Sequence, residues 1–473
     1  MKKSAVLVGV MLALGFVGSA SATQFQFHGD LNNRFMLYTD QAQVYSGSGT
    51  TAIGSPNNGT AVNRNINKDG IEEAWGDIKY RLWVEAASDD GKIKGVYGIE
   101  LGALRFGNGA GIGGSTRTGG GGFSGDGVNV ETRWAYTDFQ IPGVERKARV
   151  SIGLIPFKIN EYFWSETAMG VQYKGTAGPV DLSFAWVRGV EDFNNATDDK
   201  LFADLDALTA RVDFKVTKDI PIGLFAVYQG RSPSDTKRQG FVPGTDFQVK
   251  ALKNVDFDLY TLGADGKISF PTGIGNAFLN WDLIYQGGSL TDNSATDRDI
   301  NAWFAHADAG VNIDKIRLTY TTWYSSGDSN PTDGKIQNYL STDIDMTASR
   351  VLMESYTDDN YFTESTTILD KGMFLNKLAL DCKATKKLTV GAAVLYLQTA
   401  KNLTLAGGKT TKKLGTEIDA YLSYQLFPNT TLDVGGGYLF ADDAMDFFEV
   451  AAQRNGTSDT DIVRLDSRLR YTF

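Results

Sequence analysis

The strongest constraint on the fold is a repeated alternation of apolar and polar side chains with a period of two. This pattern is typical of β-strands that have one apolar face. It occupies residues 74–86, 277–286, 414–425 and 463–473. In the first stretch one face carries Ala74, Gly76, Ile78, Tyr80, Leu82, Val84 and Ala86, and the other carries Trp75, Asp77, Lys79, Arg81, Trp83 and Glu85. The sequence has no heptads or long helical stripes, and it therefore predicts an all-β chain.

The connections between these stretches alternate between short turns and longer loops. Turn-forming residues mark eight short connections, near 89–91, 142–143, 177–179, 219–221, 271–273, 314, 386 and 428–429. Nine longer loops lie between them, at 39–70, 107–127, 156–168, 191–206, 232–254, 289–298, 326–370, 400–413 and 441–460. These connections predict 18 antiparallel strands in up-and-down order. If residues 169–174 belong to the preceding loop, the count falls to 16.

The first residues of the chain predict export. Lys2 and Lys3 precede an apolar run over residues 5–17, and Ala20-Ser21-Ala22 has the small-x-small pattern of a cleavage site. We therefore expect residues 1–22 to be a cleaved signal peptide and residues 23–473 to be the mature domain. The formal net charge is −10, and an acidic exported chain is unsuited to nucleic-acid binding.

Alternation alone does not show whether the apolar face meets a protein core or lipid. Short turns on one side and long loops on the other are typical of outer-membrane barrels, whose long loops are extracellular. Aromatic residues near both strand ends, such as Phe270 and Tyr471 at the short turns and Tyr285 at a long loop, predict membrane girdles. We therefore expect a transmembrane β-barrel rather than a soluble β-sandwich, because closure leaves no unpaired edge in lipid.

Two segments carry a resemblance to a known family. The C-terminal Leu469-Arg470-Tyr471-Thr472-Phe473 resembles the signal read by the barrel assembly machinery, and residues 150–157 resemble the porin strand that leads into the third loop. The mature chain thus resembles a Gram-negative general porin, and most closely the homotrimeric porins of delta-proteobacterial sulfate reducers. Two features depart from that family: the third connection is short for a constriction loop, and 18 strands are more usual in substrate-selective channels.

The resemblance implies several properties. Leu469, Tyr471 and Phe473 would form the assembly signal, and the protein would be a homotrimer in contact with outer-membrane lipid and lipopolysaccharide. Residues 156–168 would form an inward constriction loop. A barrel of this size encloses a water-filled lumen, whose width and charge select the solutes. We therefore expect passive diffusion of ions and small hydrophilic solutes through a porin.

The candidate site is the set of charged side chains that face the lumen. Alternation places these basic residues inside: Arg34, Lys79, Arg81, Arg133, Arg149, Arg464, Arg468 and Arg470. The same alternation directs Trp134 and Tyr136 towards lipid. The hypothesis is a basic wall of Arg34, Lys79, Arg81, Arg133 and Arg468 opposite Lys158, Glu161 and Glu166 of the third loop; the resemblance implies such a transverse field. The alternative is a set of ordinary solvated charges.

Other functions remain as alternatives. A substrate-selective channel for a sugar, amino acid or organic anion is the main one, and Trp75 and Trp83 on one inward face would suit sugars. A structural surface protein is a further one. We expect no enzyme, because the sequence has only His28 and His306 and no G-x-S-x-G motif.

Two loops carry motifs that we interpret without a cofactor. The Gly109-x-Gly111-x-x-Gly114 pattern in the glycine-rich loop lacks the helix that a dinucleotide site requires. The loop at 326–370 is acidic and could bind a divalent cation, although solvated charge is the favoured interpretation and no spacing matches an EF-hand. Its carboxylates are Asp328, Asp333, Asp343, Asp345, Glu354, Asp358 and Asp359. We therefore expect no cofactor and no metal site elsewhere.

Overall fold

The computed structural model describes residues 23–39, 73–106, 130–144, 148–191, 204–217, 219–233, 241, 248–291, 297–353, 366–448, 455–458 and 461–473. The predicted signal peptide, the glycine-rich loop at 107–127 and three of the loop carboxylates, Glu354, Asp358 and Asp359, lie outside these residues. None of the helices in the described part of the chain has the length and apolarity needed to cross a bilayer.

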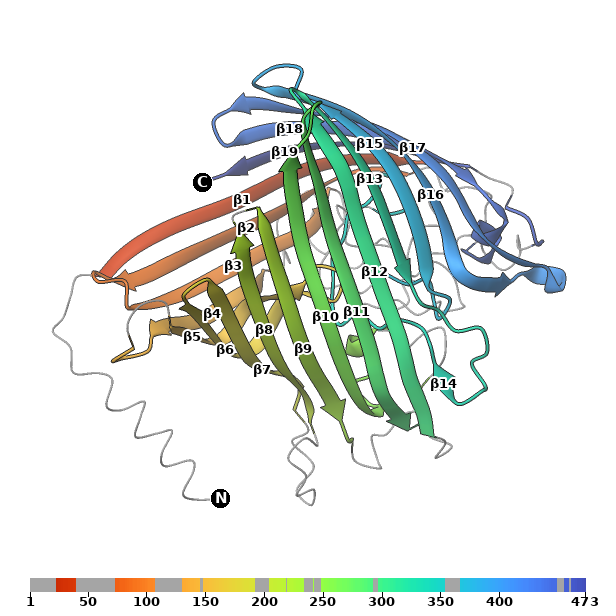
Figure 1. The fold of residues 1–473 in the computed structure, drawn as a ribbon. Coiled ribbons are helices and arrows are strands. Elements are labelled where there is room, and N and C mark those ends of the chain that lie inside the picture. Colours follow the sequence, from red (N-terminus) through yellow and green to blue (C-terminus); the bar gives the residue numbers. More distant parts are fainter. Residues whose placement is uncertain are drawn as a thin grey trace.

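Long antiparallel strands form a closed 18-stranded barrel (Figure 1). The strands are β1 (Thr23–Tyr38), β2 (Glu73–Ser88), β3 (Ile93–Arg105), β4 (Glu131–Gln140), β5 (Arg149–Asn160), β6 (Trp164–Ala177), β7 (Val180–Val190), β8 (Leu205–Thr217), β9 (Ile220–Arg231), β10 (Asp256–Pro271), β11 (Asn276–Thr291), β12 (Asp297–Ile313), β13 (Ile316–Ser325), β15 (Met373–Cys382), β16 (Leu388–Thr404), β17 (Thr410–Phe427), β18 (Thr430–Ala441) and β19 (Ile462–Thr472). The short β14 (Lys335–Ile336) lies in the connection between β13 and β15 and pairs in parallel with β12.

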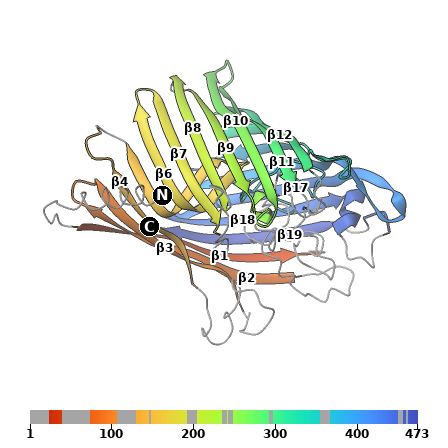
Figure 2. The ribbon, with the colours of Figure 1, turned by 90° about the horizontal axis from the view of Figure 1, so that it is seen from below.

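The barrel closes between its first and last strands. β1 pairs with β2 on one side and with β19 on the other, and Figure 2 shows β1 beside β19. The predicted count of 18 is confirmed, and the alternative of 16 is wrong, because residues 169–174 are part of β6. In the described parts of the connections there are three short 3-10 helices: η2 (Val249–Ala251), η3 (Ala406–Gly408) and η4 (Asp443–Phe448).

The outer face of the barrel is apolar, as the alternation predicted. On β1, Phe25, Phe27 and Phe35 are 62%, 72% and 53% exposed, whereas Arg34 between them is 4% exposed and faces inward. Trp303 and Tyr324 stack on the outer face near the long-connection end, with ring centroids 4.7 Å apart. Such an apolar band is suited to contact with lipid hydrocarbon. Closure of the sheet allows neighbouring strands to pair their backbone groups, as a hydrocarbon environment requires.

The short turns lie at the turn-forming residues from which they were predicted. Gly91, Gly143 and Gly178 have φ between 62° and 76°, and Asp314 and Asn429 have φ of 49° and 60°. Gly, Asn and Asp tolerate this left-handed conformation best, which explains why they mark the tight turns of the barrel.

One β-bulge changes the face of a strand. β3 and β4 pair as Gly98 with Trp134 and Ile99 with Thr132, so Arg133 is an extra residue. A bulge shifts the alternation by one position. Trp134 consequently contacts the lumen residue Trp83 with ring centroids 5.3 Å apart, and Tyr136 packs against the interior cluster. The expectation that Trp134 and Tyr136 face lipid is therefore wrong.

The C-terminus closes the barrel at its short-turn end. The main-chain groups of Phe473 and Gly29 exchange two hydrogen bonds of 2.9 and 3.1 Å. The Phe473 ring covers Gly29 so closely that a Cβ there would lie 2.4 Å from it, so a larger residue at this position would require the ring to move. Leu469, Tyr471 and Phe473 all point outward and are 39–46% exposed. Their role as an assembly signal stays a prediction.

Candidate functional site

A hairpin leaves the barrel wall and enters the lumen. β5 pairs with β4 only as far as Leu154, and β6 pairs with β7 only from Gly170 onwards. Gly153 and Gly170 lie opposite each other at this departure point. A Cβ at either position would lie 2.2–2.3 Å from a main-chain oxygen of the neighbouring strand, so the close backbone approach requires glycine. Beyond it, residues 155–169 pair with each other and no longer with β4 or β7, and Trp164 forms a parallel bridge with Asp343. We call residues 155–169 the lumen hairpin.

The structure of the lumen hairpin differs from the third loop that the sequence predicted. Residues 156–160 continue β5 and residues 164–168 begin β6, so the connection is a turn over residues 161–163 rather than a loop over 156–168. Strand structure persists here because the hairpin buries its own apolar residues inside the barrel. Phe157, Ile159, Phe163 and Trp164 are each at most 6% exposed. A constricting role for this segment stays a prediction.

The hairpin tip reaches the opposite wall. The Asn160 amide donates to Asp265 on β10 at 3.1 Å and to Asp282 on β11 at 2.6 Å. The Tyr162 hydroxyl lies 2.9 Å from Nε2 of His306 on β12, and Phe163 stacks on Phe225 of β9. We call the wall residues that receive the tip, Arg211, Asp265, Asp282, His306 and Asp308, the dock.

We call the acidic loop at 326–370 loop 7, and its described residues, 326–353 and 366–370, also fold into the lumen. Its residue Tyr339 donates to the Tyr162 carbonyl at 3.2 Å, and its Leu340 amide donates to Gln286 of β11 at 2.9 Å. The Thr342 amide donates to the Phe163 carbonyl at 2.8 Å. Loop 7 therefore covers the hairpin tip and joins it to the wall.

Loop 7 continues to the far side of the barrel. Glu417 on β17 is fully buried and accepts three main-chain amides, from Arg350 at 2.8 Å, Val351 at 2.6 Å and Leu352 at 3.2 Å. The Arg350 side chain donates to Asp466 of β19 at 2.8 Å. A buried carboxylate that accepts several amides is a strong anchor, since charge-assisted hydrogen bonds contribute about 1.5–3 kcal/mol each.

The structure brings four of the predicted site residues together. Lys79 and Arg81 on β2 and Arg133 on β4 surround Glu100 on β3, with an ion pair between Arg81 and Glu100 and distances of 3.8 Å from Glu100 to Lys79 and to Arg133. Arg133 also pairs with Glu166 of the lumen hairpin at 2.5 Å. We call these five residues the basic cluster. Sequence reasoning missed Glu100, although its inward position on β3 follows from the alternation.

The other predicted residues lie elsewhere. Arg34 is buried in an ion pair with Asp77, and Arg149 pairs at 2.5 Å with Asp138 near a short turn. Lys158 and Glu161 pair with each other at 3.0 Å on the hairpin, where both are more than half exposed. On β19, Arg464 is fully buried and donates to the Arg350 carbonyl, Arg468 pairs with Asp433, and Arg470 pairs with Asp30. Arg34 and Arg468 lie directly opposite each other on β1 and β19. The basic wall facing the loop, and its role in selectivity, stay predictions.

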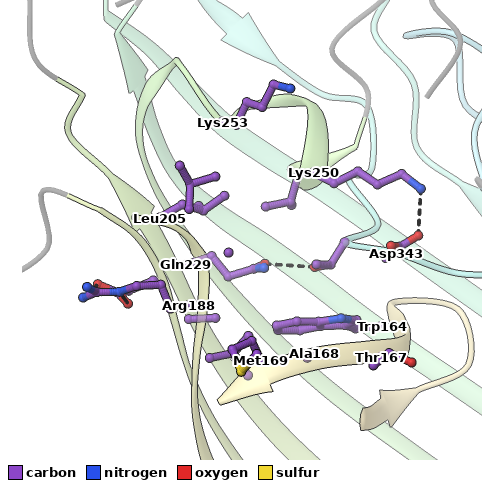
Figure 3. Close-up of a pocket in the computed structure, with 17 residues that line it drawn as sticks. Trp164, Thr167, Ala168, Met169, Arg188, Leu205, Gln229, Lys250, Lys253 and Asp343 are labelled. Atoms are coloured by element: carbon purple, nitrogen blue, oxygen red, sulfur yellow. Dashed lines mark hydrogen bonds and ion pairs between the residues drawn. The ribbon is translucent and has the colours of Figure 1, made fainter. Parts of the chain in front are cut away.

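A cavity of about 390 Å³ lies where the hairpin leaves the wall (Figure 3). Trp164, Val187 and Leu205 provide apolar lining, and Gln229, Lys250, Lys253 and Asp343 provide polar lining. Lys250 pairs with Asp343 of loop 7 at 2.8 Å, and Gln229 accepts from Thr342 at 3.1 Å. Burial raises the pKa of Asp343, and the nearby Lys250 opposes that rise. The volume suits a small organic solute.

Two carboxylates in the described part of loop 7 accept hydrogen bonds from main-chain amides of the loop itself. Asp328 accepts the Asn330 amide at 2.7 Å and Asp333 accepts the Lys335 amide at 3.0 Å. No group of three or more metal-ligating side chains occurs among the described residues. Binding of a divalent cation by this loop stays a prediction.

Comparisons with known proteins add evidence on the fold. No family model matches the chain, and no curated protein matches it. Among solved structures, the outer membrane protein OprD from Pseudomonas aeruginosa is similar with a TM-score of 0.52 and 10% identity, over 95% of this chain and 93% of that chain. OccAB4 from Acinetobacter baumannii is similar with a TM-score of 0.52 and 10% identity, over 95% of this chain and 98% of that chain.

This chain has the fold of an outer-membrane protein. A third similar structure, OpdK from Pseudomonas aeruginosa with vanillate, gives a TM-score of 0.51 and 11% identity over 95% of this chain and 98% of that chain. OprD and OpdK are described as outer membrane proteins, and the closed barrel with an apolar outer face is that of a Gram-negative outer-membrane protein. The resemblance to delta-proteobacterial porins, the homotrimer and the lipopolysaccharide contacts stay predictions.

Proposed function

We propose that this protein is a substrate-selective channel that passes small organic anions across the outer membrane by passive diffusion. The observation that carries the proposal is the filling of the lumen by two packed segments, the lumen hairpin and loop 7. Tyr339, Leu340, Val351 and Leu352 of loop 7 are fully buried within the barrel. A barrel of this size without such segments would leave a wide aqueous pore, so these segments favour selection over general diffusion.

The basic cluster supports a preference for anions. Its three cations, Lys79, Arg81 and Arg133, outnumber its two carboxylates, Glu100 and Glu166. The cation side chains are 15%, 29% and 25% exposed, so solvent and solutes can reach them. Positive charge on the wall of a narrow passage raises the local concentration of anions.

The cavity beside the hairpin supports an organic solute. Trp164 and Leu205 offer an apolar surface, and Lys250 and Lys253 lie on the same cavity. A solute with an apolar body and an anionic group would match both parts of this lining. One of the similar structures, OpdK, is described with vanillate, which is an aromatic carboxylate.

Single-channel recording in planar bilayers tests the proposal. We expect small conductance steps, anion selectivity in a salt gradient, and block by one class of organic anions. Large steps that no solute blocks would identify a general porin instead. Silence from a correctly folded barrel would overturn transport altogether and favour the structural surface protein.

The same recordings test the predicted oligomer. We infer a homotrimer from the resemblance to homotrimeric porins, and conductance steps that arrive in threes are the expected result. Single, independent steps would indicate a monomer and would leave the channel function unchanged.

A further inference from the structure

We propose that the hairpin tip and the dock form an acid-sensitive latch, which holds the lumen hairpin across the barrel at neutral pH and releases it when the dock carboxylates are protonated. The proposal concerns regulation and rests on the proposed channel function. Release would widen the passage and raise the conductance, because pore diameter sets conductance.

The tip binds the dock through charge-assisted hydrogen bonds. Asn160 is 5% exposed, and its amide donates to two carboxylates on different strands, Asp265 and Asp282. Arg211 donates to the Ile159 carbonyl at 2.9 Å and to Asp265 at 2.6 and 2.8 Å. The wall therefore binds the end of β5 at two residues: Asp265 and Asp282 accept from Asn160, and Arg211 donates to Ile159. Such bonds weaken when the carboxylate becomes neutral.

His306 is the centre of the dock. Its Nδ1 lies 2.8 Å from Asp282, and its Nε2 lies 3.3 Å from Asp308 and 2.9 Å from the Tyr162 hydroxyl. Because a carboxylate lies at each ring nitrogen, the geometry favours an imidazolium that donates from both. The two aspartates hold the ring against Tyr162.

Protonation would reverse the balance of charge in the dock. The charged and titratable groups that face His306 and its neighbours are Glu161, Tyr162, Arg211, Asp213, Asp265, Asp282, Asp308, Tyr339 and Lys377. At neutral pH the aspartates offset the cations. When the aspartates are protonated, Arg211 and His306 remain as cations in one partly buried region, and Asn160 loses its charged acceptors. Acid therefore disfavours the docked state.

The hairpin is built so that release is local. Above Gly153 and Gly170 it pairs with neither β4 nor β7, so undocking breaks no ladder of the barrel wall. Its backbone hydrogen bonds to loop 7, from Thr342 to Phe163 at 2.8 Å and from Ser165 to Asp343 at 2.9 Å, join neutral groups. Outside the dock the hairpin also forms an ion pair with the wall, from Glu166 to Arg133 at 2.5 Å. The charge-dependent contacts described between the hairpin and the wall are therefore the dock and this ion pair.

Conductance against pH is the first test. Wild-type protein should show about a twofold rise in single-channel conductance between pH 7 and about pH 4, where aspartates protonate. Asp282→Asn keeps the side-chain size and removes the charge, so at pH 7 it should already show the high conductance. Asp181→Asn is the matched control, because Asp181 is a carboxylate paired with Lys215 outside the dock. A wild-type conductance that does not change with pH, or an Asp282→Asn channel that behaves as wild type, would overturn the latch.

A spin label on the hairpin separates this proposal from the channel function. Lys158 is 56% exposed on the hairpin, and Cys382 is the single cysteine, so Lys158→Cys in a Cys382→Ser background gives one labelling site. We expect an immobile label at pH 7 that becomes mobile at about pH 4, and a mobile label at pH 7 when Asp282→Asn is added. A mobile label in a silent barrel would support the latch while refuting transport. A label that stays immobile in a conducting barrel would refute the latch alone.

Discussion

The two charged regions of the lumen both combine basic side chains with carboxylates, but they differ in what their charges face. In the basic cluster, Lys79, Arg81 and Arg133 remain partly exposed around two carboxylates. In the dock, Asp282 and His306 are 9% and 6% exposed, and the hairpin tip covers them. The basic cluster can therefore act on a passing solute, whereas the dock acts on the chain itself. The difference between the two regions is therefore whether solutes can reach the charged side chains, and not the sign of the charge.

The largest expected effect is a change of ion selectivity on neutralising the basic cluster. Arg81→Gln combined with Arg133→Gln removes two of its three cations and leaves Glu100 and Glu166 in excess. The reversal potential in a salt gradient should shift towards cations, because the local potential changes sign. An unchanged reversal potential would show that the conducting path does not pass this wall.

The opposite change sharpens the comparison. Glu100→Gln removes the carboxylate that three cations share, so the reversal potential should shift towards anions. Glu100 is 6% exposed, and the loss of its charge also costs the barrel about 1–3 kcal/mol through repulsion and unpaired donors. Urea unfolding measures that cost. A shift towards cations would contradict the assignment of this cluster to the solute path.

A smaller effect is expected at the anchor of loop 7. Glu417→Gln replaces a carboxylate that accepts three amides by a neutral group with one oxygen. Arg350 and Val351 donate to Oε1 and Leu352 donates to Oε2, so an amide oxygen in place of Oε1 leaves Leu352 without its acceptor and the other two bonds without charge assistance. We expect a noisier open channel and faster proteolysis within residues 326–370, with selectivity unchanged. Equal proteolysis of Glu417→Gln and Asp181→Asn would show that this anchor does not hold the loop.

The smallest effect concerns Asp343 and pH. Burial raises the pKa of Asp343, so the folded chain binds a proton there at a pH at which the unfolded chain has lost it. This group therefore adds stability as the pH falls through the raised pKa, and the contribution is absent above it. Its side chain is still 31% exposed, which keeps the effect small. Urea unfolding between about pH 6 and pH 4 should show a rise that Asp343→Asn lacks.

Much of the barrel was predictable because a β-strand exposes alternate residues to opposite surroundings. The strand count, the outward Phe25, Phe27 and Phe35, and the turns at Gly91 and Asn429 follow from local sequence. The failures have local causes as well. The bulge at Arg133 reverses the face of Trp134 and Tyr136, and no residue in that stretch announces an insertion in the ladder. The extension of β5 and β6 through 156–168 depends on burial inside the barrel.

The sequence by itself determined that this chain forms a closed barrel of 18 strands with an apolar outer face, because lipid and hydrogen bonding act on each strand in the same way. Only the tertiary structure decided what fills the lumen. Asn160 meets Asp282 across 122 residues, and Arg350 meets Asp466 across 116. Such contacts depend on which strands face each other after closure, and a periodicity of two residues carries no information about partners so distant in the chain.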